Sequence, residues 1–517
     1  MEIGPYRVNP DGTLRYNDGS WDEFANVLFI DSPVGTGYSY VDTDSFVHEL
    51  KDMAQQIVTF LKNFFSLFPE YEDNDIYIAG ESYAGQHIPY IAAAIQFNNK
   101  LPTQHRIWDV KGLLIGNGWI SPVEQYDSYL TMAYENGVIQ GGSEEAKQVE
   151  KQHKLCTDQL NQPGSLDKVD LPACEQILTE ILRVSQNDGK CYNMYDLRLR
   201  DGYPSCGMAW PPDLTQLTPY LRRQDVKDAL HVNKDKQTGW QECNGAVSGA
   251  FKPVKSPPSI QILPDIIKEI PIILFSGDQD LICNHIGTEE LIHNMEWNGG
   301  KGFELSPGTW APRKHWTFEG EPAGLYQEAR NLTYILFYNS SHMVPFDYPR
   351  RTRDMLDRFM NVDIASIGGM PTDSRIDGEK GVETSVGGHP NSTSAEQEEA
   401  EKLEKAKWAA YYKSGEVALV VVIILATAWG FYVWRDRRRR AGYDSLFGGS
   451  GNSLLRKGGR DVEAADFDES ELDDLHIASP EPQEDGVEET YSVGGGSEDE
   501  ANGKPNGHGK EKPYSDR

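Results

Sequence analysis

The sequence contains no C-x-x-C pair, and its six cysteines all lie between Cys156 and Cys283. Zinc sites usually need such pairs, so their absence disfavours a metal centre and favours disulfides. Basic residues are also scarce, with 49 lysines and arginines against 80 aspartates and glutamates and a formal net charge of −31. Such a negative chain is a poor partner for nucleic acid. We therefore expect no metal, no cofactor and no nucleic-acid ligand.

The N-terminus lacks the charged and apolar stretch of a secretory signal, because Met1 runs directly into Glu2-Ile-Gly-Pro. Disulfides nevertheless indicate an oxidising compartment, and the sequons at Asn331, Asn339 and Asn391 are typical of lumenal glycosylation. Either the chain begins inside a longer protein, or the secretory interpretation is wrong.

What the sequence does contain is a serine among small residues, in the run Gly80-Glu-Ser82-Tyr-Ala84-Gly85. Residues 75–79 before it are β-branched and aromatic and predict a buried strand, and residues 86–96 behind it predict a helix. This arrangement is typical of the nucleophile elbow of α/β-hydrolases, where a sharp turn exposes the hydroxyl near a helix N-terminus. The pattern predicts Ser82 as a catalytic nucleophile.

Apolar strands and amphipathic helices alternate around this motif. We predict further buried strands at residues 27–30, 110–115, 270–276 and 332–338, and helices at 45–68 and 352–360. Strands that are apolar throughout and alternate with helices favour a mostly parallel sheet. The fold class is therefore α/β, with an α/β-hydrolase domain over residues 1–365.

Residues 122–221 interrupt this alternation with a polar, partly helical segment. It holds Cys156, Cys174, Cys191 and Cys206, and it is predicted to be an insertion stapled by two disulfides. Four cysteines allow three pairings. Our choice is the nested one, Cys156–Cys206 with Cys174–Cys191.

The C-terminal part of the chain has a different composition. Residues 366–412 read as a lumenal linker, and residues 417–434 are unbroken by charge and as a helix would span about 27 Å, close to the bilayer thickness. Five arginines follow between Arg435 and Arg440, which places the C-terminal side in the cytosol. We predict a single-pass type I membrane protein with a disordered acidic tail over 435–517 and a sorting-adaptor motif at Tyr443-Asp-Ser-Leu446.

Three polar residues follow predicted strands in the order Ser82, Asp280, His342, which is the order of the α/β-hydrolase triad. A serine hydroxyl attacks only when a base takes its proton. His342 is the candidate base, and Asp280 would fix its tautomer and stabilise the imidazolium.

Three blocks together resemble the serine carboxypeptidases: Gly80-Glu-Ser-Tyr-Ala-Gly, Gly277-Asp-Gln-Asp-Leu-Ile-Cys-Asn and His342-Met-Val-Pro-Phe-Asp. The similarity covers residues 2–360 and selects Asp280 over Asp278 as the triad acid. With the predicted membrane span and acidic tail, the chain most resembles the fungal pheromone-processing branch of that family. The resemblance implies removal of C-terminal Lys and Arg from precursor peptides in the trans-Golgi network.

The resemblance also implies substrate-binding residues. Glu2 and Glu81 would share a proton and donate a hydrogen bond to the terminal carboxylate of the substrate, since two adjoining carboxyl groups cannot both ionise. Such a device predicts best activity at mildly acid pH. The Tyr83 N–H would serve the oxyanion, Met343 would line the leaving-residue pocket, and Cys283 would be the family's unpaired cysteine in a substrate subsite.

The chain departs from the family at its start. Upstream of the segment that matches Glu2-Ile-Gly-Pro, the family carries an Asn-Gly-Gly-Pro-Gly-Cys-Ser-Ser block. That block supplies a second oxyanion donor, a strand and a cysteine that by match would pair with Cys243. We expect the natural start to lie upstream of Met1.

Two other functions share parts of this pattern. A related acyltransferase would use the same triad and pass the acyl group to an alcohol instead of water. If Met1 is the true start, an inactive membrane-bound binding or sorting protein is the third possibility.

Overall fold

The structure is a computed structural model that describes residues 2–42, 44–102, 106–236, 239–362, 371–379 and 385–386. The predicted membrane span at 417–434, the tail at 435–517, the tyrosine motif at 443–446 and Asn391 all lie outside these residues. Of the helices that the structure does describe, none has the length and apolar character that a bilayer crossing needs.

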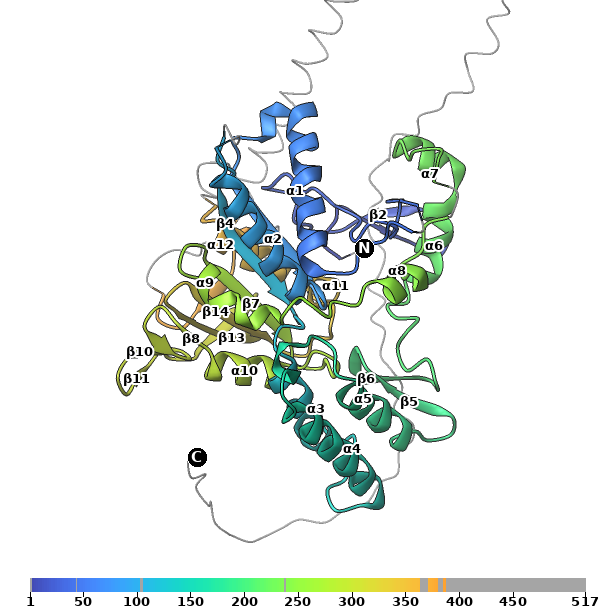
Figure 1. The fold of residues 1–517 in the computed structure, drawn as a ribbon, viewed down its shortest axis with the longest axis vertical. Helices are drawn as coiled ribbons and strands as arrows, with labels where there is room; N and C mark the ends of the chain where they lie inside the picture. Colours follow the sequence, from blue (N-terminus) through green and yellow to red (C-terminus); the bar gives the residue numbers. More distant parts are fainter. Residues whose placement is uncertain are drawn as a thin grey trace, which may run out of the picture. The chain divides into compact units, whose positions relative to one another are not determined.

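One seven-stranded sheet forms the centre of the fold (Figure 1). Its order is β16 (Ser374–Ile376), β12 (Lys314–Phe318), β13 (Glu321–Ala329), β14 (Leu332–Phe337), β7 (Ile272–Gly277), β4 (Val110–Gly116) and β3 (Ile76–Glu81). Strands β3, β4, β7 and β14 run parallel, and β13, β12 and β16 continue the sheet antiparallel. The carboxyl ends of the four parallel strands therefore meet at one edge of the sheet.

Alternate residues of the central strands bury on opposite faces, as a strand's period of two requires. Leu113 and Ile115 pack in a core with helices α2 (Ala84–Asn99), α9 (Leu263–Ile266) and α10 (His285–Asn294). Leu114 packs in a second core with α12 (Pro349–Phe359). Because helices cover both faces, β4, β7 and β14 are largely buried, and the α/β-hydrolase prediction is confirmed. The strand before Ser82 was predicted to be buried, but β3 is at the end of the described sheet and none of its residues is buried.

Local signals placed most elements of the sheet correctly, but residues 27–30 are not a strand. No strand among the described residues pairs with this segment, so Leu28 and Phe29 stay 43% and 62% exposed. The antiparallel strands β12 and β13 were not predicted. Part of the predicted linker is also a strand, β16, which pairs with β12 and buries Ile376.

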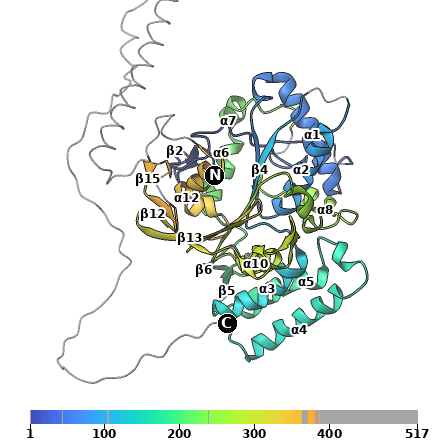
Figure 2. The same ribbon diagram turned by 90° about the vertical axis from the view of Figure 1, so that its left-hand side faces the viewer.

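The predicted insertion contains α3 (Pro122–Glu135), α4 (Glu144–Leu160), α5 (Pro172–Val184), the hairpin of β5 (Lys190–Asn193) and β6 (Asp196–Gly202), and α6 (Leu214–Arg222). Helix α3 contacts α10, and α3, α4 and α5 lie together beside the sheet (Figure 2). The remaining described elements are short or lie outside the sheet. The helices are α1 (Leu50–Leu67), α7 (Gln224–Ala229), α8 (Gly245–Ala250) and α11 (Val344–Asp347), with three 3-10 turns, Pro69–Tyr71, Ser165–Asp167 and Ser259–Gln261. The strands are β1 (Tyr6–Val8), β2 (Leu14–Tyr16), β8 (Glu296–Trp297), β9 (Gly300–Lys301), β10 (Glu304–Ser306), β11 (Thr309–Trp310), β15 (Pro371–Thr372) and β17 (Ser385–Val386).

The insertion carries two disulfides, as predicted, but the nested pairing was wrong. Cys156 pairs with Cys174 across the antiparallel helices α4 and α5, with their Cα atoms 4.4 Å apart. Cys191 pairs with Cys206, which ties β5 to the turn after β6, with the Cα atoms 5.5 Å apart. Each bridge closes one local unit, the helix pair or the hairpin, whereas the nested pairing would have to connect the two.

Removing the hairpin disulfide should destabilise the fold. Replacing Cys191 and Cys206 together by serine is expected to lower the free energy of unfolding by about 3 kcal/mol, because the unfolded chain regains the freedom of a closed loop. Urea unfolding measures the change. The Cys243→Ser variant, which removes an exposed free thiol, is the matched control. A double variant as stable as this control would contradict the assigned pairing.

Candidate active site

Ser82 lies in a strained turn between β3 and α2. Its φ is 60°, in the left-handed region that costs a non-glycine residue of order 1–3 kcal/mol. The Ser82 amide donates to the Gly116 carbonyl at 3.0 Å, and the Ser82 carbonyl accepts from the Trp119 amide at 2.8 Å. A Cβ on Gly85 would lie 2.5 Å from the Trp119 carbonyl oxygen. The small residues of the motif therefore allow the turn to press against the end of β4.

Asp280 and His342 follow β7 and β14, which are neighbours in the sheet. Asp280 is fully buried, and its Oδ2 accepts a hydrogen bond from Nδ1 of His342 at 2.7 Å. Nε2 of His342 then lies 3.8 Å from Oε1 of Glu81, the residue before Ser82. No described hydrogen bond joins Ser82 Oγ to His342; in many enzymes such bonds tighten only when substrate is present. The structure thus brings the predicted triad residues to one edge of the sheet.

Three further donors hold the Asp280 carboxylate. Nδ2 of Asn117, at the end of β4, donates to Oδ2 at 2.8 Å, and the amides of Ile282 and Cys283 donate at 3.1 and 3.3 Å. Asn117 has a φ of 40°, which asparagine tolerates better than most residues. The sequence analysis ended the predicted strand at residue 115 and gave Asn117 no role, so this member of the site was missed.

The β5–β6 hairpin of the insertion also contacts the site. The Met194 carbonyl accepts from the amides of Leu281 and Ile282, both at 3.1 Å, and the Tyr195 carbonyl accepts from the His342 amide at 2.8 Å. The Tyr195 ring lies 5.1 Å from the imidazole. The hairpin therefore fixes the backbone of both the Asp280 and the His342 loops.

Glu2 and Glu81 form a hydrogen-bonded carboxyl pair beside Ser82. Burial raises the pKa of both groups, and the charge of Glu2 raises the pKa of Glu81 further, well above its usual value. Asp280 and Asp347 add to the rise at Glu81. Two carboxyls in such contact share a proton. The structure brings together the two glutamates that the family resemblance singled out.

The other predicted substrate-binding residues surround the same point. The Cys283 thiol is buried and lies within hydrogen-bonding reach of the Ser82 side chain. The Tyr83 amide has no acceptor among the described residues, and its ring packs 5.3 Å from His87 and 6.2 Å from Phe251. Met343 is half-buried at the start of α11.

Two predicted glycosylation sites, Asn331 and Asn339, are exposed at opposite ends of β14. Cys243 is an exposed free thiol. Within the described ranges, no group of three or more His, Cys, Asp or Glu side chains is arranged to hold a metal ion.

A family model described as serine carboxypeptidase, peptidase S10, matches residues 1–362. The chain belongs to the serine carboxypeptidase family. It is thus a hydrolase that cleaves peptides from their carboxyl end, and the match covers every described residue of the site.

Full-length relatives point to the same activity. The chain is 64% identical to the pheromone-processing carboxypeptidase kex1 of Sclerotinia sclerotiorum over 100% of this chain and 84% of the relative. It is 62% identical to the enzyme of the same name from Coccidioides posadasii, over 97% of this chain and 80% of the relative. A crystal structure of a prohormone-processing carboxypeptidase from Saccharomyces cerevisiae matches with a TM-score of 0.66 and 38% identity, over 70% of this chain and 79% of that one. These matches support a serine carboxypeptidase rather than an acyltransferase.

The two free cysteines of this carboxypeptidase should differ in reactivity. Burial raises the pKa of the Cys283 thiol well above its usual value, so Cys283 lacks both access and thiolate character. A brief treatment of the native chain with iodoacetamide is expected to alkylate the exposed Cys243 and leave Cys283 intact, as read by peptide mass spectrometry. The Cys243→Ser variant should show almost no native labelling, and equal labelling of both thiols in the wild type would refute the burial of Cys283.

Proposed function

We propose that this serine carboxypeptidase uses Ser82 as nucleophile, His342 as general base and Asp280 to orient the imidazole, and that it removes Lys and Arg from the carboxyl ends of precursor peptides. The observation that supports the triad is the 2.7 Å bond between His342 Nδ1 and the buried Asp280 carboxylate, next to a strained serine turn. Because Nδ1 carries the proton that it donates to Asp280, Nε2 is free to accept a proton. This is the tautomer that a general base needs.

The reaction then follows from these positions. Ser82 Oγ attacks the scissile carbonyl carbon, Nε2 of His342 takes the hydroxyl proton, and the same proton passes to the leaving amine. The Tyr83 amide donates to the oxygen on which negative charge develops. Water, activated by the same imidazole, then attacks the acyl carbon; the bond to Ser82 Oγ breaks, the shortened peptide leaves, and the imidazolium returns a proton to Oγ.

An exopeptidase must also recognise a terminal carboxylate. A shared proton lets the Glu2–Glu81 pair donate a hydrogen bond to that anion without a fixed cation. Cys283 and Met343 flank the nucleophile and the base, so we assign them to the pockets for the residues on either side of the cleaved bond.

The preference for basic residues has two supports. The relatives at 59–64% identity are named as pheromone-processing carboxypeptidases, the branch of the family whose resemblance to this sequence implies basic carboxyl ends. Acidic side chains also surround the site: the charge of Glu242 faces Glu2, and the charges of Asp170 and Glu175 face Tyr83. Acidic surroundings attract cationic peptide ends.

The same relationship supports a trans-Golgi location, with the enzyme domain in the lumen, a membrane anchor at residues 417–434 and sorting through the 443–446 motif. We assign Asn331, Asn339 and Asn391 as glycan acceptors. The exposure of Asn331 and Asn339 and the two disulfides are in keeping with a lumenal domain.

Substituting the nucleophile tests the function directly. Ser82→Ala is expected to lower kcat by roughly 10⁶-fold, because the hydroxyl that forms the acyl-enzyme is removed. The assay measures lysine released from an N-blocked peptide that ends in lysine, and fluorophosphonate labelling of Ser82 gives an independent readout. The matched control is Ser185→Ala, a serine on the insertion far from the triad in sequence. Release of lysine by Ser82→Ala at the wild-type rate would exclude the proposed nucleophile.

The carboxyl pair should make binding pH-dependent. Its raised pKa keeps the shared proton at mildly acid pH, so KM is expected to rise as the pH increases through that pKa. Glu81→Gln retains a neutral donor at every pH, so its KM should vary much less with pH. KM is measured across the acid to neutral range.

A peptide whose terminal carboxylate is replaced by an amide is the substrate control, because it has no anion for the pair to bind. If the KM of Glu81→Gln rises with pH as steeply as that of the wild type, the pair does not bind the terminal carboxylate.

A further inference from the structure

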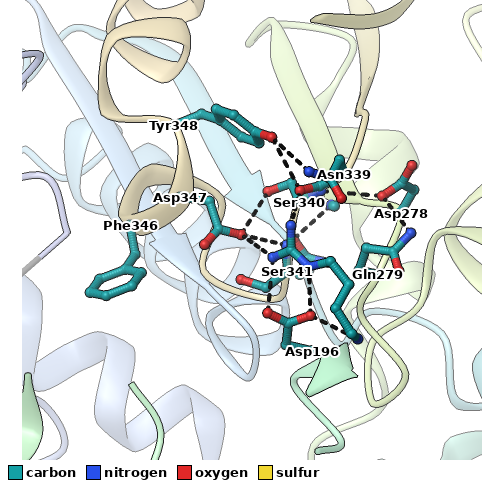
Figure 3. A network of polar contacts seen from close by, with 12 residues as sticks. Asp196, Asp278, Gln279, Asn339, Ser340, Ser341, Phe346, Asp347 and Tyr348 are labelled. Carbon is teal, nitrogen blue, oxygen red and sulfur yellow. Dashed lines mark hydrogen bonds and ion pairs between the residues drawn. The ribbon is translucent and has the colours of Figure 1, made fainter. Parts of the chain in front are cut away.

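Asp196, Asp347, Ser340 and Ser341 belong to one polar network, which includes residues of the segment 339–347 around His342, called the His342 loop below (Figure 3). None of these four residues acts on the substrate in the chemistry derived above, although the charge of Asp347 raises the pKa of Glu81. Asp347 Oδ2 accepts from the Ser341 amide at 2.6 Å and from the Ser340 hydroxyl at 3.4 Å. Asp347 therefore holds the two residues that precede His342.

Arg198 is the cation of this network. Its Nε and Nη2 donate to the two oxygens of Asp196 at 2.8 and 2.9 Å, a bidentate pair that fixes the plane of the guanidinium. Nη2 also donates to Asp347 Oδ2 at 3.2 Å, and Nη1 donates to the carbonyl of Asn339. A single side chain of the β5–β6 hairpin thus contacts the His342 loop at Asn339 and at Asp347.

We propose that Arg198 is a positioning residue for the reaction: it ties the His342 loop to the hairpin and compensates the charge of Asp347 beside the carboxyl pair. The proposal rests on the role proposed for His342. The bidentate pair with Asp196 supports it, because Asp196 is nearly buried and leaves the guanidinium few alternative directions. Lysine has no fork and could not reproduce these contacts.

The charges near His342 and Glu81 determine the direction in which the pH profile is expected to move when Arg198 is replaced. The ionisable groups that face the carboxyl pair and His342 are Arg7 and Glu242 near Glu2, Asp280, Cys283 and Asp347 near Glu81, and Tyr195 against the imidazole. The charge of Asp347 already raises the pKa of Glu81. Without Arg198, the negative charge of Asp347 would be less compensated, which favours the protonated form of the carboxyl pair.

The test compares Arg198→Gln with Arg200→Gln in the full chain. Arg200 is on the same strand, but it donates to the Ser185 carbonyl at 3.1 Å and lies over the Tyr192 ring, away from the His342 loop. For Arg198→Gln, kcat is expected to fall 10- to 100-fold while KM at the optimum pH stays near the wild-type value, because a displaced base slows the chemical step. Its pH profile of kcat/KM should move up by roughly one pH unit. Arg200→Gln should match the wild type in both.

Two further variants keep the test decisive. Arg198→Lys keeps the charge without the fork, so its pH profile should stay in place while kcat remains reduced. Asp347→Asn removes the opposing charge but keeps an acceptor for the Ser341 amide, so its profile should move to lower pH. This variant gives the answer even if Arg198→Gln does not fold.

The proposal is overturned if the profile of Arg198→Gln superimposes on that of Arg200→Gln, or if Asp347→Asn leaves the profile unchanged. His342→Ala is assayed beside them with the same lysine-ending peptide. If His342→Ala remains active, the proposed role of His342 is wrong. If His342→Ala is inactive but the Arg198 and Asp347 variants behave as wild type, only the positioning role of Arg198 is wrong.

Discussion

The buried carboxylate of Asp280 imposes the strictest condition on this fold. A carboxylate without solvent must have hydrogen-bond donors on every side, since an unpaired one costs several kcal/mol. Those donors come from Asn117 after β4, from two amides of its own loop and from His342 after β14. Strands β4, β7 and β14 must therefore end at the same level of the sheet. A Cβ on Gly277 would lie 2.1 Å from the Ser341 carbonyl, which shows how closely the loops meet.

Because the loops that carry Asp280 and His342 also bond to the β5–β6 hairpin, the insertion forms part of the candidate active site. The carbonyls of Met194 and Tyr195 accept hydrogen bonds from the amides of Leu281 and His342. Without the hairpin, both loops would therefore lose a backbone hydrogen-bond partner. The Cys191–Cys206 disulfide closes that hairpin, and the Met194 amide donates to the Cys206 carbonyl at 2.9 Å. The Cys191–Cys206 disulfide is therefore linked by one hydrogen bond to Met194, which binds the Asp280 loop.

Sequence alone predicted the elements whose signals are local. The turn at Ser82 could be recognised because small residues, a strand and a helix adjoin it in the chain. Asn117 could not, because its partner Asp280 is 163 residues away and nothing near Asn117 indicates a buried carboxylate. Arg198 binds Asp347 at a separation of 149 residues, so it reads as one more basic residue in a polar segment. The segment at 27–30 failed for the opposite reason: its local pattern is that of a strand, but strand formation needs a neighbour to pair with.

The charges around Glu81 also bear on the anion site proposed for the Glu2–Glu81 pair. An arginine beside Glu81 would hold an anion directly, but it would lower the pKa of Glu81 and release the shared proton. Placing Arg198 behind the loop and Arg7 near Glu2 gives partial compensation at a distance. The carboxyl pair keeps its raised pKa, and the imidazole keeps an anionic partner in Asp280. The pH range in which the proposed pair keeps its proton then depends on the acids around Glu81 as well as on the pair itself.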